Sequence, residues 1–166
     1  MTSRIDSTFA RLREQGRTAV IPYIACGDPY ADATVDIMLA LAQGGADVVS
    51  ASRYMRGGRQ IGGPPLKRLM SRVAGLTLHW FARVPTHDPT NNFKLYSRRF
   101  LESTTIESTA GFELALELTV KATLAHRKIA EIPTTWRDRT AGQSNFKLRK
   151  WLPHYLHWYR VAFFRR

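Results

Sequence analysis

The spacing of apolar residues predicts alternating helices and strands in the first third of the chain. Residues 3–16 repeat apolar side chains at helical intervals, whereas AVIPYIA (19–25) reads as a short strand that ends at a turn-prone GDP. A second helix should begin at Asp32 or Thr34, run to about Leu41 and stop at the glycines 44 and 45, before a second strand at 46–52. A strand–helix–strand unit implies a parallel sheet with a right-handed crossover.

The rest of the chain predicts further helices and strands between basic loops. Residues 53–65 hold four glycines, two prolines and three arginines and should form a loop. Beyond it, the pattern predicts a helix over 66–84 whose apolar stripe consists of Leu66, Leu69, Val73, Leu76 and Trp80. A turn and strand over 86–96 and a helix over 112–127 should follow. A strand is predicted over 128–136, at a sheet edge because it contains Pro133, and then a polar loop over 137–146.

Composition fits one ordinary α/β domain with an uneven distribution of charge. The 166 residues are 44% hydrophobic, which argues against disorder. Residues 1–50 carry four Lys/Arg and six Asp/Glu, whereas residues 51–166 carry 21 and seven. Such a basic block favours nucleic acid, anionic lipid or phosphorylated ligands as partners.

The chain shows no signal peptide at its N-terminus and no run of 18 apolar residues, so we expect a cytoplasmic protein. The single cysteine, Cys26, excludes an intramolecular disulfide and is expected to be a buried apolar residue.

Two loops combine arginine with glycine, the pattern expected of a phosphate-binding site. SRYMRGGRQ contains Arg53, Arg56 and Arg59 beside two glycines, and RDRTAGQSNFK clusters Arg137, Arg139, Ser144 and Lys147 around Gly142. Guanidinium groups bind phosphate oxygens in pairs, and glycine lets backbone amides approach an anion. The alternative is that both loops are solvated basic turns.

Acidic residues and histidines give weaker signals. Asp88 begins a turn and most simply caps its own backbone. Glu113 and Glu117 lie one helical turn apart, and we expect a solvated face with Glu117 paired to Lys121. The five histidines are scattered without a completing carboxylate or cysteine, so no metal site is predicted.

The C-terminal residues 151–166 form a basic and aromatic segment. Trp151, Tyr155, Trp158 and Ala162 share one helical stripe, and most cations lie elsewhere. Aromatic rings beside cations suit a bilayer interface, which predicts peripheral attachment at the inner face of a membrane. The alternative is a terminal helix that packs on the core.

From Gly45 to about Tyr159 the chain resembles the C-terminal half of the family-two glycosyltransferases, in the branch that includes dolichol-phosphate mannose synthase. Four segments carry the resemblance: GADVVSASRYMRGGRQ, PTHDPTNNFKLY, GFELALELTVKA and EIPTTWRDRTAGQSNFKL. It implies a partial GT-A nucleotide-sugar fold and transfer of a sugar to a polyprenyl-phosphate acceptor. It also implies donor or phosphate contacts from Arg53, Arg59, Arg139, Ser144 and Lys147, with Asp88 as the catalytic residue.

The resemblance also has gaps. Ala51 and Asn92 stand where the family usually has glycine, and the Asp-x-Asp motif that holds Mg²⁺ or Mn²⁺ is absent. A bound metal would neutralise the leaving diphosphate, so we expect little or no sugar transfer.

Residues 3–48 resemble a different family, the tryptophan synthase alpha chain, through SRIDSTFARLREQGRTAVIPYIACGDP and TVDIMLALAQGGADV. This implies the start of a TIM barrel. In that family a catalytic glutamate follows GADxx, and Ser50 occupies the position here, so release of indole is not expected. Binding to the family's beta subunit would support this alternative.

Together these resemblances predict a chimera: 1–48 of tryptophan synthase alpha type, 49–150 of glycosyltransferase type, and the interfacial segment 151–166. The predicted function is an inactive glycosyltransferase; the alternatives are an inactive tryptophan synthase alpha fragment or a non-enzymatic module that binds anionic lipid. Half folds should also leave sheet edges and apolar faces exposed, which predicts marginal stability or aggregation.

Overall fold

The computed structural model describes residues 10–11, 14–15, 33–109, 113–138 and 148–164. Within them the chain is a mixed α/β structure with two small sheets. The predicted helix at 3–16 and strand at 19–25 lie almost wholly outside the described residues, as does most of the polar loop at 137–146. With a three-stranded and a two-stranded sheet, the described residues form neither a barrel nor a GT-A arrangement.

The first described helix and strand match the prediction. Helix α2 (Ala33–Gln43) leads to strand β1 (Val48–Ser52). Gly45 has a positive φ of 83°, and the amide of Ala46 bonds the carbonyl of Leu41 at 3.1 Å, so the two glycines end the helix as expected.

The three-stranded sheet has the order β3-β1-β4, with β1 at its centre. Strand β3 (Lys94–Tyr96) is antiparallel to β1, with Val49 opposite Leu95. Strand β4 (Ile129–Pro133) is parallel to β1, with Ser50 opposite Glu131. As Pro133 predicted, β4 is an edge strand among the described residues.

Strands β2 (Arg59–Ile61) and β5 (Thr135–Arg137) form a separate parallel pair, with Arg59 opposite Thr135 and Ile61 opposite Arg137. The sequence predicted a loop at 53–65, and β2 lies inside it. Because β2 follows β1 and β5 follows β4, this pair extends the parallel contact between the two longer strands.

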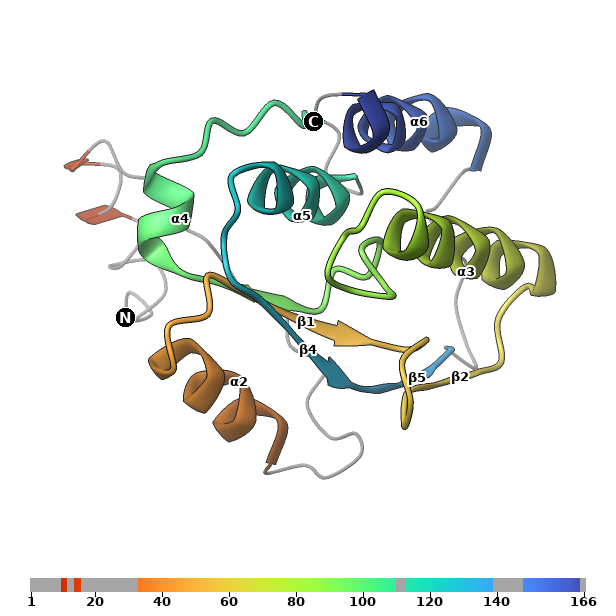
Figure 1. Ribbon diagram of the computed structural model, residues 1–166, viewed down its shortest axis with the longest axis horizontal. Helices are drawn as coiled ribbons and strands as arrows, with labels where there is room; N and C mark the ends of the chain where they lie inside the picture. The colour runs from red at the N-terminus through yellow and green to blue at the C-terminus, as the bar shows by residue number, and fades with distance from the viewer. Residues whose placement is uncertain (1–9, 12–13, 16–32, 110–112, 139–147, 165–166) are drawn as a thin grey trace.

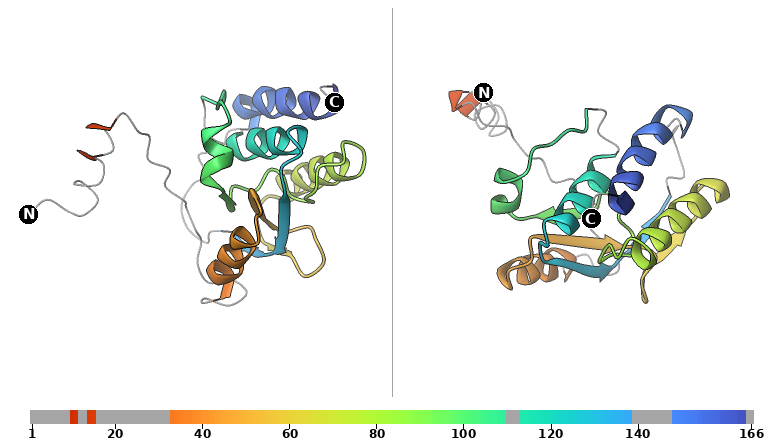
Figure 2. Two further views of the ribbon diagram at one scale, coloured as in Figure 1. Left: turned by 60° about the vertical axis from the view of Figure 1, so that its left-hand side comes forward. Right: turned by 45° about the horizontal axis from the view of Figure 1, so that its top comes forward.

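Helices cover both faces of the three-stranded sheet (Figure 1). Helix α2 lies on one face, where Met38 packs with Val49 and Ala51 of β1. On the other face lie α3 (Pro65–Trp80), α5 (Leu114–Leu124) and α6 (Leu148–Phe164), side by side in both views of Figure 2. Val48 contributes to this side, in a cluster with Leu118 and with Phe100 of the short helix α4 (Arg98–Glu102).

Candidate functional site

An arginine–aspartate pair lies where β1 ends. Arg53 follows the last residue of β1, and Asp88 lies in the turn between α3 and β3. The Arg53 Nε atom donates to Asp88 Oδ2 at 2.7 Å and Nη2 donates to Oδ1 at 2.8 Å, while the Arg53 amide also reaches Oδ2 at 3.1 Å. Asp88 is fully buried. Burial alone lowers the pKa of Arg53, but the hydrogen bonds and charge of Asp88 outweigh it, so the pKa is raised.

Further polar side chains join this pair to the surrounding elements. Arg53 Nη2 also donates to Ser71 Oγ of α3 at 3.1 Å, and Ser71 bonds Thr90 at 3.0 Å. The buried Lys94 ammonium donates to the carbonyls of Asp88 and Asn91 at 2.9 and 2.7 Å. Burial lowers the pKa of Lys94 to about 8. The network therefore ties β1, α3 and the turn before β3 together.

Both oxygens of Asp88 are occupied by Arg53, so the structure gives this carboxylate a role in holding the fold. The catalytic role expected of Asp88 and the phosphate contact expected of Arg53 stay predictions. Arg59 lies exposed on β2, and Arg56 is exposed in the preceding turn. Arg139, Ser144 and Lys147 lie outside the described residues, and Arg137, where their loop starts, lies opposite Ile61 in the β2–β5 pair.

A second polar cluster, which the sequence analysis missed, lies on β4. Glu131 accepts hydrogen bonds from Thr86 Oγ1 at 2.7 Å and from the amide of His87 at 2.6 Å, and its other oxygen lies 2.7 Å from His87 Nδ1. The His87 ring stacks on that of His79 with centroids 3.8 Å apart. No local sequence pattern could have predicted this cluster, because its outermost residues, His79 and Glu131, lie 52 positions apart.

Ser50 lies beneath this cluster. It is fully buried on β1, opposite Glu131, and its hydroxyl accepts a hydrogen bond from Thr86 at 3.1 Å. A hydroxyl in this setting completes the packing between β1, β4 and the turn at 86–88.

Glu117 of α5 and Glu113, which directly precedes the helix, are not on a solvated face, contrary to expectation. Glu113 and Glu117 are both buried. Glu117 does pair with Lys121 at 2.7 Å, as predicted, and it also accepts from the amides of Glu107 and Ser108 at 2.7 Å each. Burial raises the pKa of Glu117, but these hydrogen bonds outweigh it and the pKa is lowered. The carboxylate thereby holds the segment before α5.

The aromatic stripe predicted for the bilayer interface faces the core instead. Trp151, Trp158 and Ala162 are buried, and Trp158 packs with Leu78 of α3 and Leu116 of α5. The alternative, a terminal helix that packs on the core, is therefore the correct interpretation of this stripe. Pro153 lies inside α6.

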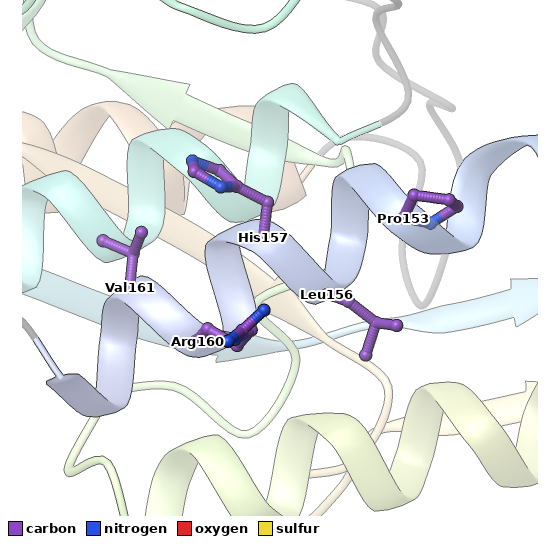
Figure 3. Close-up of a pocket in the computed structure, with 5 residues that line it drawn as sticks. All are labelled: Pro153, Leu156, His157, Arg160 and Val161. Carbon is purple, nitrogen blue, oxygen red and sulfur yellow. The ribbon is translucent and has the colours of Figure 1, made fainter.

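A different side of α6 is exposed. Leu152, Leu156 and Phe164 are exposed apolar residues. Figure 3 shows a pocket on this helix in which Leu156 and Arg160 project from one side and His157 and Val161 from the other, with Pro153 at the end. Mostly apolar and open, it resembles a surface hollow more than an enclosed catalytic cleft.

The part of the chain that the structure describes contains no group of three His, Cys, Asp or Glu side chains able to hold a metal ion. The Mg²⁺ or Mn²⁺ expected of an intact glycosyltransferase stays a prediction. Among the same residues no helix is long and apolar enough to cross a bilayer.

Comparison with known proteins shows what the N-terminal part is similar to. Residues 9–51 match the family model described as tryptophan synthase alpha chain. The protein of that name from Methylibium petroleiphilum is 74% identical to this chain over 47 residues, which are 28% of this chain and 17% of the relative. The one from Leptothrix cholodnii is 64% identical over 47 residues, again 28% of this chain and 17% of the relative. The Burkholderia mallei protein is 44% identical over 79 residues, 46% of this chain and 29% of the relative.

These matches bear on the predicted chimera. The chain spans about a sixth of the length of the first two relatives. The resemblance of the N-terminal part to tryptophan synthase alpha is confirmed. The alignment with the Burkholderia protein is longer than 48 residues, so part of it lies beyond the predicted first boundary.

The glycosyltransferase interpretation is wrong. The three relatives given above are named tryptophan synthase alpha chain, and they support neither sugar transfer nor a nucleotide-sugar or lipid-phosphate partner. The four segments that suggested it are short, and arginine beside glycine does not by itself specify one activity.

Proposed function

We propose that this chain is a tryptophan synthase alpha-type fragment that has lost the lyase reaction and binds peripherally, as a basic non-enzymatic module, at the inner face of a membrane. One observation carries the binding proposal: α3 and α6 lie side by side and together hold six Lys/Arg and no Asp/Glu.

Loss of the lyase reaction follows from the residue at position 50. In the family that the N-terminal part resembles, a glutamate at this position does acid–base work. Here a buried serine bonds Thr86 and faces Glu131 across the β1–β4 pair. A serine hydroxyl does not exchange protons near neutral pH as a carboxylate does. The purified chain should therefore release no indole from indole-glycerol phosphate above background.

The two helices are in direct contact and carry exposed arginines. Tyr159 of α6 donates to Thr77 of α3 at 2.8 Å, which holds the helices together. Arg68, Arg72 and Arg160 are exposed on them. Each Lys or Arg near an anionic leaflet contributes about 1 kcal/mol to binding. The three exposed arginines would therefore contribute about 3 kcal/mol to an attachment that weakens as salt screens the charges.

Sedimentation with phosphatidylcholine vesicles, with and without 30% phosphatidylserine, tests the proposal at 50 and 500 mM NaCl. We expect binding to the anionic vesicles alone, and most of it should be lost at the higher salt. The variant R68E/R72E should bind at least about 30-fold more weakly, because the loss of two arginines costs about 2 kcal/mol and the two glutamates add repulsion.

The matched control is R98E/K128E, which changes the net charge equally on α4 and before β4. It should lose far less affinity, because Arg98 and Lys128 are exposed away from α3 and α6. Equal losses in both variants, or tighter retention of duplex DNA than of vesicles at matched salt, would contradict the proposal.

A pull-down with a tryptophan synthase beta chain tests the family's own partnership. Because this chain spans about 17% of its first relatives, we expect no stable complex. Capture of the beta chain would instead support a retained role in that assembly.

A further inference from the structure

Helix α3 buries a small and partly polar face. Ser71 points to the Arg53–Asp88 pair, and Leu78 belongs to the core shared with α5 and α6. Gly75 lies against the turn at 86–89, where an added Cβ would come within 2.2 Å of the His87 carbonyl oxygen. These three positions share one side of the helix at 100° per residue.

The large apolar residues of α3 lie on the opposite side. Leu66, Leu69, Val73 and Trp80 are 51–69% exposed, and Leu76 between them is half-buried. At helical spacing these five side chains form a stripe about 80° wide, centred roughly opposite Ser71 and Gly75. The stripe predicted from the sequence is therefore real, but it faces away from the molecule.

We infer that this outward stripe of α3 inserts into the interface of an anionic bilayer, with the helix axis parallel to the membrane surface. The inference rests on the proposed function and names the face that enters the lipid. Interfacial helices bury their apolar face about 5–10 Å deep, at the boundary between headgroups and acyl chains. Trp80 is the C-terminal residue of the stripe, and the exposed Phe81 directly follows it.

The cations of α3 lie where headgroups would be. Arg68 and Arg72 are exposed one turn apart, between the outward stripe and the buried side of the helix. Long arginine side chains reach from such a position to lipid phosphates while their stems cover apolar surface. Leu156 and Arg160 project from one side of the neighbouring α6 and repeat the same pairing of apolar and cationic groups (Figure 3).

Charge favours a bilayer over a second copy of the chain. A twofold contact through α3 would place the arginines of one copy near those of the other, because such a contact pairs a surface with itself. Helix α3 has no acidic residue to relieve that repulsion. An anionic leaflet complements both the cations and the apolar stripe.

A neutral substitution separates apolar insertion from charge. L69Q/V73Q removes two stripe residues and leaves net charge unchanged. Its control, L39Q/I106Q, removes two comparably exposed apolar residues on α2 and before α5. On vesicles with 30% phosphatidylserine we expect L69Q/V73Q to bind at least about tenfold more weakly and the control to bind like the wild type.

Fluorescence quenching by brominated phosphatidylcholine in the same vesicles locates the stripe. Trp151 and Trp158 are buried and Trp136 of β5 is half-buried, whereas Trp80 is 69% exposed. Most of the quenching should therefore disappear in W80F and persist in W136F. Circular dichroism melts of each variant confirm that folding is unchanged.

The outcomes distinguish the two proposals. If wild type binds anionic vesicles and L69Q/V73Q binds equally well, the insertion of α3 is overturned while peripheral binding stands. If the wild type binds no vesicles, both fall. A dimer that forms without lipid and is lost in L69Q/V73Q would assign the stripe to self-association and also overturn the inference.

Discussion

At the scale of single residues, the polar groups at the end of β1 do structural work that their types alone do not reveal. Arg53 and Asp88 suggested a ligand site because arginine and aspartate bind and move charges. In the structure their charges satisfy each other, and Ser71 and Lys94 complete the network. A buried ion pair of this kind holds the fold strongly when intact and is costly when one partner is lost.

Asp88→Asn tests this role. The substitution leaves the buried Arg53 guanidinium without its counter-charge, so the free energy of unfolding should fall by about 3–5 kcal/mol. Urea denaturation followed by circular dichroism measures it, with Arg98→Ala as the control because Arg98 is exposed and pairs with Glu102 on the surface. A loss no larger than that of the control would show that the pair contributes little.

Gly75→Ala tests the close contact between α3 and the turn at 86–89. The new methyl group would lie 2.2 Å from the His87 carbonyl oxygen, so the helix must move away from the turn. We expect destabilisation of about 2 kcal/mol or more despite the better helix propensity of alanine. Gly44→Ala, whose Cβ would meet only atoms at 3.4 Å, should be close to neutral in the same assay.

At the scale of helices and strands, Glu117 makes the attachment of one segment to α5 depend on pH. Its pKa is lowered from 4.5 by hydrogen bonds from Lys121 and two backbone amides that outweigh its burial. The folded state therefore favours the ionised form. This stabilisation is fully present above about pH 4.5 and is lost as pH falls through the lower folded pKa.

The measurement is the free energy of unfolding between pH 7 and pH 3 for wild type and Glu117→Gln. The wild type should lose more stability over the acid part of this range than the variant, which has no carboxylate to protonate at position 117. The exposed Glu102 supplies the control, since Glu102→Gln should keep the steeper acid loss. Parallel curves for wild type and Glu117→Gln would refute the assignment.

Periodicity predicted most elements but not the direction in which their faces point. The helices at 66–84 and 112–127 and the strands at 46–52 and 128–136 correspond to α3, α5, β1 and β4. An apolar stripe shows that a helix is amphipathic, and it does not say whether protein or another phase covers the stripe. Hence Trp158 of α6 was assigned to lipid but is buried, whereas Leu69 of α3 is exposed.

The candidate site was predictable only where its residues are close in sequence. The β2–β5 pair and the Glu131–His87 contact join segments more than 40 residues apart, and no local pattern specifies them. Helix α3 also ends at Trp80, earlier than expected, because Arg83 takes a left-handed conformation with φ of 50°. Sequence spacing carries no sign of that turn.

At the scale of the whole molecule, the core and the exposed apolar surface are separate, and this separation predicts how the protein aggregates. One core cluster contains Leu78, Leu116 and Trp158 and lies on one side of the sheet. Another contains Met38 and Val49 and lies on the other side. The outward stripe of α3 belongs to neither cluster. Exposed contiguous apolar surface drives association without contributing to the stability of the monomer.

L69Q/V73Q should therefore slow aggregation of the lipid-free protein. Its melting temperature should stay within about 2 °C of the wild type, because surface substitutions away from the core change the free energy of unfolding by about 0.5 kcal/mol or less. Light scattering at 37 °C measures the first quantity and a thermal melt of dilute protein the second. Anionic vesicles should slow wild-type aggregation to a similar degree, since lipid covers the same side chains. A lower melting temperature in L69Q/V73Q would mean that the stripe packs against protein. Aggregation that persists unchanged would point to another surface, such as β4, which is an edge strand among the described residues.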